Sequence, residues 1–455
     1  MALRETYHRL LDATARVIVC ACFMGTVLVC STVRAGAAVS IHSFNEFNQR
    51  SLTQDNKSIA AVTNHAATQT SRINVADKQL TLQLADHSAL LGGSSSLLKD
   101  ITLQRGSIAG VKGSWVRLTK VATGMHGLIW DGSELYAIEP TAEVSALLDP
   151  AIPAPKSDTI IFKLSDTSID LGGDYCASGD HDDAARTGLA TYKALTTELD
   201  QPNVDNGAPT LRLEMQALAD AAMRAQYGSD QDAIDAIVVR LNNVDGIFTA
   251  QLGLTIEATS IQLLDASTLS ASTDPGTLLS SLAQLRLSTP GMSSYAATHL
   301  FTGRDLDGDV LGISYIGNLC GARYATSLSE MRNRGAWLDS LVAAHELGHQ
   351  LGAVHDGTGV CSDTPSEGYL MSSIISGTDE FSACSRDSIL AGMQHAACLV
   401  PVGNPDLGGP SSGAASSAVA ATPSEGGGGT LSLGWLILLS MVAALQQRPL
   451  LSRAT

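Results

Sequence analysis

Residues 345–356 read HELGHQLGAVHD, and this stretch decides both the chemistry and the fold that we expect. His345 and His349 lie four positions apart, so on a helix their imidazoles share one face and can hold one metal ion. Glu346 projects beside that ion, where its carboxylate can take a proton from water. The pattern predicts a metal-assisted hydrolase.

The residues that follow this pair supply a third metal ligand. Gly352 can break the helix and let the chain turn back, so that His355 supplies a third nitrogen. Three protein ligands leave one tetrahedral position open, which is typical of a catalytic rather than a structural zinc. Met371 follows His355 by 16 residues in GYLMSS. A methionine turn at this point completes the signature of the metzincin zinc peptidases.

Hydrophobic periodicity predicts one α/β domain around this motif, over about residues 206–400. The strongest helix is AWLDSLVAAHELGHQLG (336–352). Apolar residues at helical or strand spacing predict further elements. The expected helices are 232–252 and 276–287, and the expected strands are 210–220, 254–264, THLFTG (298–303) and LGISYIG (311–317).

The preceding residues, 38–205, alternate short apolar segments with turns and are predicted to be mostly β. WDGSELY (130–136) has the pattern of a hairpin that turns at Asp131 and Gly132. The formal net charge of the chain is −17, which argues against nucleic acid or an anionic membrane surface as a partner.

Both ends of the chain have the composition of processing signals. Residues 1–16 carry three arginines, and a 14-residue apolar run (17–30) and small residues follow, which predicts a secretory signal peptide, residues 1–37, cleaved after Ala37. An N-terminal anchor is the alternative. Residues 401–430, rich in Gly, Ser, Pro and Ala, predict a flexible linker. Residues 431–455 begin with a largely apolar stretch of 15 residues, which is marginal for a membrane span.

Five cysteines remain after the predicted signal peptide. Four of them fall within residues 320–398, where export would permit disulfides, and they allow three pairings. These four are Cys320, Cys361, Cys384 and Cys398. Cys176 is the one left over, in DLGGDYCASGDHDD (170–183).

Between the two terminal segments the chain resembles the adamalysin/reprolysin (ADAM-like) metalloproteases. The resemblance rests on LRLEMQALAD, THLFTGRDLDGDVLGISYIGNLC, AHELGHQLGAVHD, YLMSS and FSACS, and Asp356 after the third histidine is typical of that branch. It implies a mixed five-stranded sheet with two long helices and zinc in the cleft. Residues 106–140 are similar to the propeptide of the family, so the resemblance implies a zymogen.

The same resemblance implies the disulfides Cys320–Cys398 and Cys361–Cys384. It also implies a structural calcium site, for which Glu214 matches the family's glutamate. Ala296 and Pro401 stand where the family has an aspartate and an asparagine, which weakens the case for calcium. DLDGD (305–309) could offer oxygen ligands instead, although an acidic surface turn is the simpler interpretation.

The C-terminal tail resembles a bacterial sorting signal, with glycines 426–429, a short apolar segment and Arg448. This resemblance implies a sorting protease as a partner and a protein that reaches the outer cell surface or the medium. A plain C-terminal membrane anchor is the alternative, and membrane contact is expected only through this tail.

The resemblance also places a switch cysteine late in the propeptide, and Cys176 is the only cysteine there. A thiolate can fill the open position of a catalytic zinc and keep the enzyme silent. A stray thiol on a solvated loop is the alternative.

Together these features predict a secreted or surface zinc endopeptidase made as a zymogen, acting on proteins or peptides, with Glu346 as the base. The alternative is a catalytically silent surface-binding protein that retains the fold. Such proteins usually lack the glutamate or a ligand, whereas this chain has all four residues.

Overall fold

The computed structural model describes residues 17–20, 30–33, 38–47, 69–75, 78–92, 100–170, 176, 209–308, 310–332, 334–373 and 377–402. Most of the expected signal peptide, the expected linker and the expected tail lie outside these ranges. Two short strands, β1 (Val17–Cys20) and β2 (Cys30–Val33), pair antiparallel. Within the described residues, no helix combines the length and apolar character needed to cross a membrane.

Residues 38–170, which we call the N-terminal β region, are built around an antiparallel sheet of eight strands in the order β4-β11-β10-β9-β8-β7-β6-β5. A smaller pair joins β3 (Ala38–Ile41) and β12 (Thr167–Asp170). The eight strands are β4 (Asn45–Glu46), β5 (Gln69–Val75), β6 (Lys78–Asp86), β7 (Thr102–Ile108), β8 (Trp115–Val121), β9 (Gly124–Trp130), β10 (Leu135–Pro140) and β11 (Thr159–Lys163).

The predicted hairpin is present, because β9 ends at Trp130 and β10 begins at Leu135. Asp131 holds its turn by accepting the backbone N–H groups of Ser133 and Glu134 at 3.0 and 2.9 Å.

Residues 209–402, which we call the catalytic region, form a mixed α/β layer structure. Its main sheet has the order β14-β13-β15-β17-β16, parallel except for β16, and a short β18 pairs with β13. The fold class expected from the sequence is therefore present. The strands are β13 (Leu211–Ala219), β14 (Leu254–Leu263), β15 (Ala297–Thr302), β16 (Gly312–Ser314), β17 (Thr326–Glu330) and β18 (Val400–Pro401).

The helices of the catalytic region begin with conventional caps or contacts from outside. Ser229 accepts the N–H of Asp232 and starts α5 (Asp230–Leu252), and Gly253 ends that helix in the left-handed conformation. The remaining helices are α4 (Ala221–Arg224), α6 (Pro275–Ser288), α7 (Ala336–Gln350) and α8 (Ala383–His395). The sequence patterns had indicated neither β17 nor α8.

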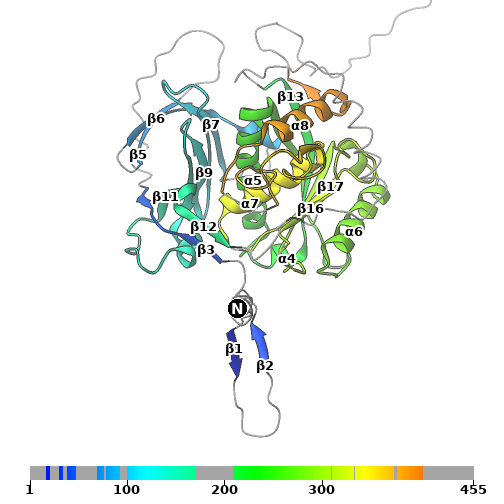
Figure 1. The fold of residues 1–455 in the computed structure, drawn as a ribbon, viewed down its shortest axis with the longest axis horizontal. Helices are drawn as coiled ribbons and strands as arrows, with labels where there is room; N and C mark the ends of the chain where they lie inside the picture. The colour runs from blue at the N-terminus through cyan, green and yellow to red at the C-terminus, as the bar shows by residue number, and fades with distance from the viewer. Residues whose placement is uncertain are drawn as a thin grey trace, which may run out of the picture. The chain divides into compact units, whose positions relative to one another are not determined.

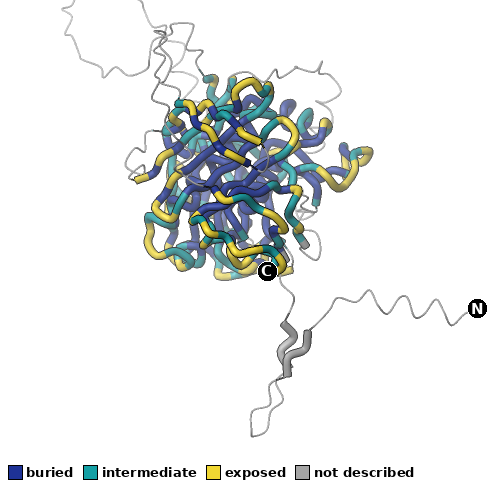
Figure 2. Tube along the Cα trace, turned by 90° about the vertical axis from the view of Figure 1, so that its left-hand side faces the viewer, coloured by how far each residue is buried: buried dark blue, intermediate teal, exposed yellow. Residues whose placement is uncertain are grey.

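The N-terminal β region and the catalytic region share one hydrophobic core. Alternate residues of β8, such as Val116 and Leu118, form a separate core within the β region, whereas Trp115 and Val121 join the core of the catalytic helices. Figure 1 shows the sheet beside α5, and Figure 2 shows buried residues throughout the centre of the folded part. One face of the β sheet is therefore a packing surface for α5.

A buried polar network crosses this contact. Asp245 of α5 accepts both Nε and Nη2 of Arg117 on β8, at 2.8 and 2.7 Å, and lies 3.4 Å from Nε2 of His87. Asn242 of α5 donates to Thr119 at 2.9 Å. The pKa of Asp245 is lowered despite its burial, because Arg117 and His87 favour its charged form.

Gly246 is a point of close approach between the two regions. A Cβ built there would lie 2.4 Å from Cζ3 of Trp115, so the tryptophan ring occupies the space of a side chain. We predict that Gly246→Ala destabilises the full chain by about 1–3 kcal/mol through overpacking. The reference is Gly276→Ala, at a helical glycine whose nearest neighbour would lie 3.6 Å away. Urea unfolding of both variants measures the difference.

Whether Gly246→Ala lowers or raises the free energy of unfolding shows whether the added methyl group clashes with Trp115. Alanine is the better helix former by about 1 kcal/mol, so Gly246→Ala without a clash would raise the free energy of unfolding. A stabilised Gly246→Ala chain would contradict the close packing of Trp115.

Candidate metal centre

The α7 helix carries the first two histidines and is buried along its whole length. Its position is fixed against α5 by a buried ion pair, in which Arg240 donates to Asp339 at 2.9 Å. Asn243 of α5 adds a hydrogen bond to Ser340 at 3.1 Å. These contacts set the rotation of α7, which determines where His345 points.

The chain turns back after α7 at the glycine that the sequence singled out. Gly352 has a φ of 112°, a conformation that favours glycine, and its N–H donates to the carbonyl of His349 at 2.9 Å. The turn brings His355 over the helix, and the N–H of Asp356 then donates to the carbonyl of Met371 at 3.0 Å.

The three imidazoles converge on one point. Nε2 of His355 lies 3.2 Å from Nε2 of both His345 and His349. Tetrahedral zinc with Zn–N bonds of about 2.0–2.1 Å separates two ligand nitrogens by about 3.3–3.4 Å. The donor set therefore fits zinc.

Hydrogen bonds on the far side of two rings fix their tautomers. Nδ1–H of His345 donates to the carbonyl of Leu370 at 2.7 Å, and Nδ1–H of His349 donates to the carbonyl of Ala353 at 2.8 Å. Burial and the adjacent imidazoles lower the pKa of His345 well below its ordinary value, and the pKa of His349 to about 3. Both rings are therefore neutral and present a lone pair at Nε2, as metal ligation requires.

Cys176 joins this cluster as a fourth donor. Its buried Sγ lies 3.5 Å from Nε2 of His349, and all four donor atoms lie within 4.8 Å of one another. Ligands bonded to tetrahedral zinc through sulfur and nitrogen are about 3.6 Å apart. The backbone of Cys176 forms a parallel bridge with Gly312, and the thiol forms no disulfide.

Glu346 lies next to the histidines in a dry environment. Burial raises the pKa of its carboxyl group to about 8, and the Cys176 thiol partly opposes this shift. A Cβ built at Gly312 of β16 would lie 2.4 Å from Oε1 of Glu346, so this glycine leaves the space that the carboxylate occupies. Sequence reasoning missed Gly312 because the contact joins residues 34 positions apart.

Comparison with known proteins agrees with this geometry. Residues 210–382 match the family described as Reprolysin_5, metallo-peptidase family M12. A 159-residue segment is 31% identical to snake venom metalloproteinase H5 of Deinagkistrodon acutus, covering 34% of this chain and 39% of that protein. A 180-residue segment is 27% identical to a zinc metalloproteinase/disintegrin of Bitis gabonica, covering 38% of this chain and 54% of that protein.

Residues 210–382 are thus similar to the reprolysin-family M12 metallopeptidase domain. The structure is also similar to metalloproteinase-II from Bacteroides fragilis, with 15% identity and a TM-score of 0.43, covering 71% of this chain and 91% of that one. The chain spans 39% and 54% of the length of the two curated relatives above.

The methionine turn lies next to the helix that carries the first two histidines. Met371 is fully buried, and a Cβ at Gly348 of α7 would lie 2.8 Å from its Sδ. The small residue at position 348 therefore lets the methionine pack directly against the zinc helix.

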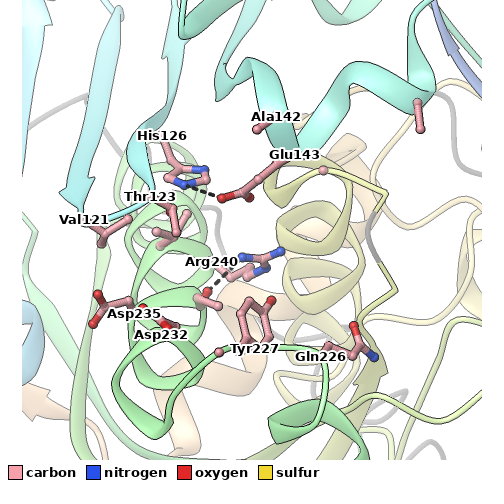
Figure 3. Close-up of a pocket in the computed structure, with 15 residues that line it drawn as sticks. Val121, Thr123, His126, Ala142, Glu143, Gln226, Tyr227, Asp232, Asp235 and Arg240 are labelled. Carbon is pink, nitrogen blue, oxygen red and sulfur yellow. Dashed lines mark hydrogen bonds and ion pairs between the residues drawn. The ribbon is translucent and has the colours of Figure 1, made fainter.

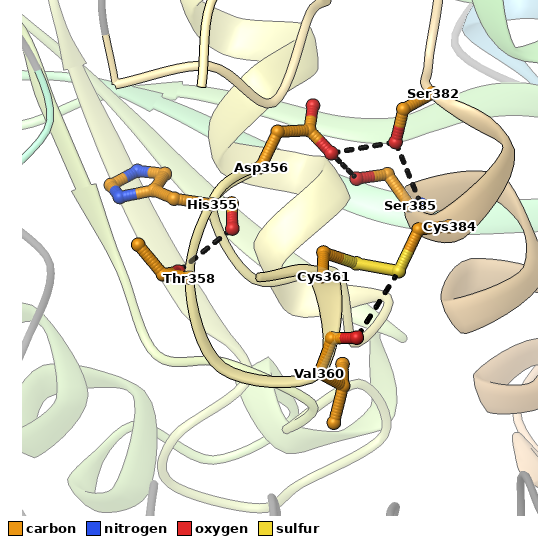
Figure 4. The surroundings of a disulfide bond; sticks show 8 residues. All are labelled: His355, Asp356, Thr358, Val360, Cys361, Ser382, Cys384 and Ser385. Carbon is orange, nitrogen blue, oxygen red and sulfur yellow. Dashed lines mark hydrogen bonds between the residues drawn. A yellow bond between two sulfur atoms is a disulfide. The ribbon is translucent and has the colours of Figure 1, made fainter. Parts of the chain in front are cut away.

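Asp356 connects the segment that follows His355 to α8 by hydrogen bonds. Its carboxylate accepts the hydroxyls of Ser382 and Ser385 at 2.6 and 2.9 Å, and its pKa is raised by burial (Figure 4). A disulfide between Cys361 and Cys384 joins the same two segments. The structure also pairs Cys320 with Cys398, so both bridges implied by the resemblance are present.

The residues considered for calcium have other partners. Glu214 accepts Nη2 of Arg212 at 2.6 Å. Asp305 pairs with Arg332, and Asp307 accepts the hydroxyl of Thr273 at 2.8 Å. Asp309 lies outside the described residues. Calcium binding at either place stays a prediction from the sequence.

The glycine under Glu346 gives a direct test of the site's geometry. We expect Gly312→Ala to displace the Glu346 carboxylate and to lower peptidase activity, while zinc stays bound because no ligand is changed. Measurements of kcat/KM and of zinc per chain on the same preparation check both parts. An alanine variant with unchanged kcat/KM would show that the carboxylate does not need this space.

Proposed function

We propose that this protein is a zinc-dependent endopeptidase that is made as a latent precursor. The observation that carries the proposal is the convergence of three imidazoles beside the buried carboxyl group of Glu346. The M12 family assignment and the snake venom metalloproteinase relatives support zinc-dependent peptide hydrolysis.

Zinc and the residues around it have separate roles in the proposed reaction. When bound, zinc supplies Lewis-acid chemistry, which polarises a substrate carbonyl and acidifies water. Glu346 accepts the proton of the attacking water and returns it to the leaving amine. Burial favours this exchange, because a carboxyl group with a raised pKa holds a proton more readily at neutral pH. Hydrogen bonds to Leu370 and Ala353 keep two ligand rings oriented throughout.

We further propose that Cys176 maintains latency. Its sulfur lies 3.5 Å from Nε2 of His349 and within 4.8 Å of the other two ligand nitrogens, and its thiol lies beside Glu346, which supports its role as a fourth ligand. A substrate carbonyl and the attacking water need the same space. The stray-thiol alternative is disfavoured, because Cys176 is buried among the zinc ligands.

Export, surface exposure and a sorting protease belong to the same proposal and rest on the sequence of the two ends. The substrates are proteins or peptides, in keeping with the M12 family. The alternative function, a silent surface-binding protein, is disfavoured because His345, His349 and His355 converge with ligand geometry and Glu346 is present beside them.

Replacement of the proposed base tests the enzymatic assignment. We expect Glu346→Gln to lower kcat by about 10²–10⁴-fold, the usual effect of losing a general base, with zinc content unchanged. Casein and peptide cleavage by the processed protein, with and without a chelator, provide the measurement. Glu367→Gln, at an exposed glutamate of the same domain, is the matched control. Equal cleavage by parent and Glu346→Gln protein would refute the mechanism.

Replacement of the switch cysteine tests latency. We expect Cys176→Ala in the unprocessed chain to raise peptidase activity, because the open zinc position then admits water and substrate. The same change in the Glu346→Gln background, which cannot process itself, should speed extraction of zinc by a chelator. If the Cys176→Ala precursor is as silent as the parent, the N-terminal β region inhibits by bulk alone.

A further inference from the structure

A second group of metal-binding side chains lies away from the reprolysin site. His126 of β9, Glu139 of β10 and Glu143 of α2 (Thr141–Val144) have donor atoms within 4.8 Å of one another. They meet at the wall of a cavity of about 470 Å³, which lies between the N-terminal β region and α5 (Figure 3). Neither the sequence motifs nor the family assignment accounts for them.

Glu139 contacts the imidazole of His126 at Nδ1, the ring nitrogen that faces away from Glu143. Its Oε2 lies 3.0 Å from Nδ1 of His126, and its Oε1 accepts the backbone N–H of Trp337 at 2.8 Å. Both oxygens are thus engaged, and His126 and Glu139 are 2% and 1% exposed. The ring is fixed in one orientation, with Nδ1 toward Glu139 and Nε2 toward Glu143.

The surroundings of Nε2, the other ring nitrogen of His126, are those of a metal ligand. Nε2 of His126 lies 3.6 Å from Oε1 of Glu143, which is longer than a hydrogen bond. Zinc bonds of about 2.0–2.2 Å to nitrogen and oxygen place two tetrahedral ligands about 3.4 Å apart. A carboxylate that accepts Nδ1–H is the usual partner of a metal-bound histidine. The Glu143 side chain is 35% exposed, so water can fill the remaining coordination positions.

The charge of the cavity favours a cation. Its wall contains the carboxylates of Glu143, Asp232 and Asp235. Arg240 also lines the cavity, but its guanidinium donates to Asp339 and to the carbonyl of Ala236. A protonated His126 paired with both glutamates is the competing interpretation, and it needs no metal.

We propose that His126 Nε2 and Glu143 bind a second divalent transition-metal ion, with Glu139 as the positioning residue for the imidazole. Imidazole with carboxylate is a donor set that suits zinc, which is the probe for the test. Two protein ligands make this site weaker than the three-histidine site. The ion would stiffen the β9–α2 corner and, through Glu139, its contact with the start of α7.

The test counts zinc in the untagged full chain carrying Glu346→Gln, which prevents self-processing. Equilibrium dialysis against zinc-buffered solutions, read by mass spectrometry, should give two zinc ions per chain. His126→Ala and Glu143→Ala should each remove the second ion and leave the first. Glu139→Gln keeps an acceptor for Trp337 but should weaken the second site about 10–100-fold.

The matched control is His42→Ala, which removes an exposed imidazole that also contacts a carboxylate, with Nδ1 3.0 Å from Asp149. Both zinc ions should remain in that variant. Binding of a single ion by the parent chain, or a second ion that persists in both His126→Ala and Glu143→Ala, would overturn the proposal. If His126→Ala fails to fold by circular dichroism, Glu143→Ala decides alone, since its side chain is partly exposed. These outcomes do not depend on peptidase activity.

Discussion

The α7 helix is buried from end to end, yet it carries polar and ionisable groups that must each find a partner. Asp339 pairs with Arg240, and the side-chain amide of Gln350 donates to the carbonyls of Tyr315 and Thr326 at 2.7 Å. The histidines use backbone carbonyls in the same way. These obligatory contacts leave α7 one position in the fold. Among the ionisable groups of α7, Glu346 is the exception, and the Cys176 thiol lies beside its carboxyl group; Nε1 of Trp337 and Oε1 of Gln350 also lack a hydrogen-bond partner among the described residues.

The same constraint governs the contact between the two regions. Asp245 lies fully buried, and the charge that compensates it comes from Arg117 of the N-terminal β region. Breaking a buried ion pair by removing one partner costs about 3–5 kcal/mol. Separation of the regions would also expose the Trp115 ring and the apolar face of α5. The two regions are thus held together by more than the covalent chain.

The amino-acid sequence predicts those elements whose pattern is local. The apolar periodicity of 336–352 and the alternation around Asp131 match α7 and the β9–β10 turn. The strand β17 was missed because its sequence TSLSE is polar, although every one of its residues is buried and the strand lies between β15 and β16 in the sheet. The helix α8 was missed for a similar reason, because its sequence ACSRDSILAGMQH has only a weak apolar stripe. The Cys361–Cys384 disulfide helps to hold this helix in place.

The zinc ligands were predictable because their spacing along one helix and one turn already brings them together. The partners of those residues were not, since Gly312 and Glu139 meet α7 only after the chain has folded. No spacing rule connects Glu139 with the N–H of Trp337, which lies 198 positions away. The cavity residues His126 and Glu143 belong to the same class of tertiary contact.

The start of α7 links the proposed latency to the stability of the fold. Gly335, its N-cap residue, has a φ of 87° and offers no side chain, so the first-turn N–H of Trp337, which has no acceptor within the helix, is satisfied by Glu139 from the N-terminal β region. The region that would block the zinc therefore also completes the helix that holds it. The last described strand before Cys176 ends at Asp170, and β13 begins at Leu211. A cut between residues 177 and 208 would leave in place the contacts between the two regions that are described above. Cleavage and separation are consequently distinct events, and the Asp245 and Glu139 contacts oppose only the second.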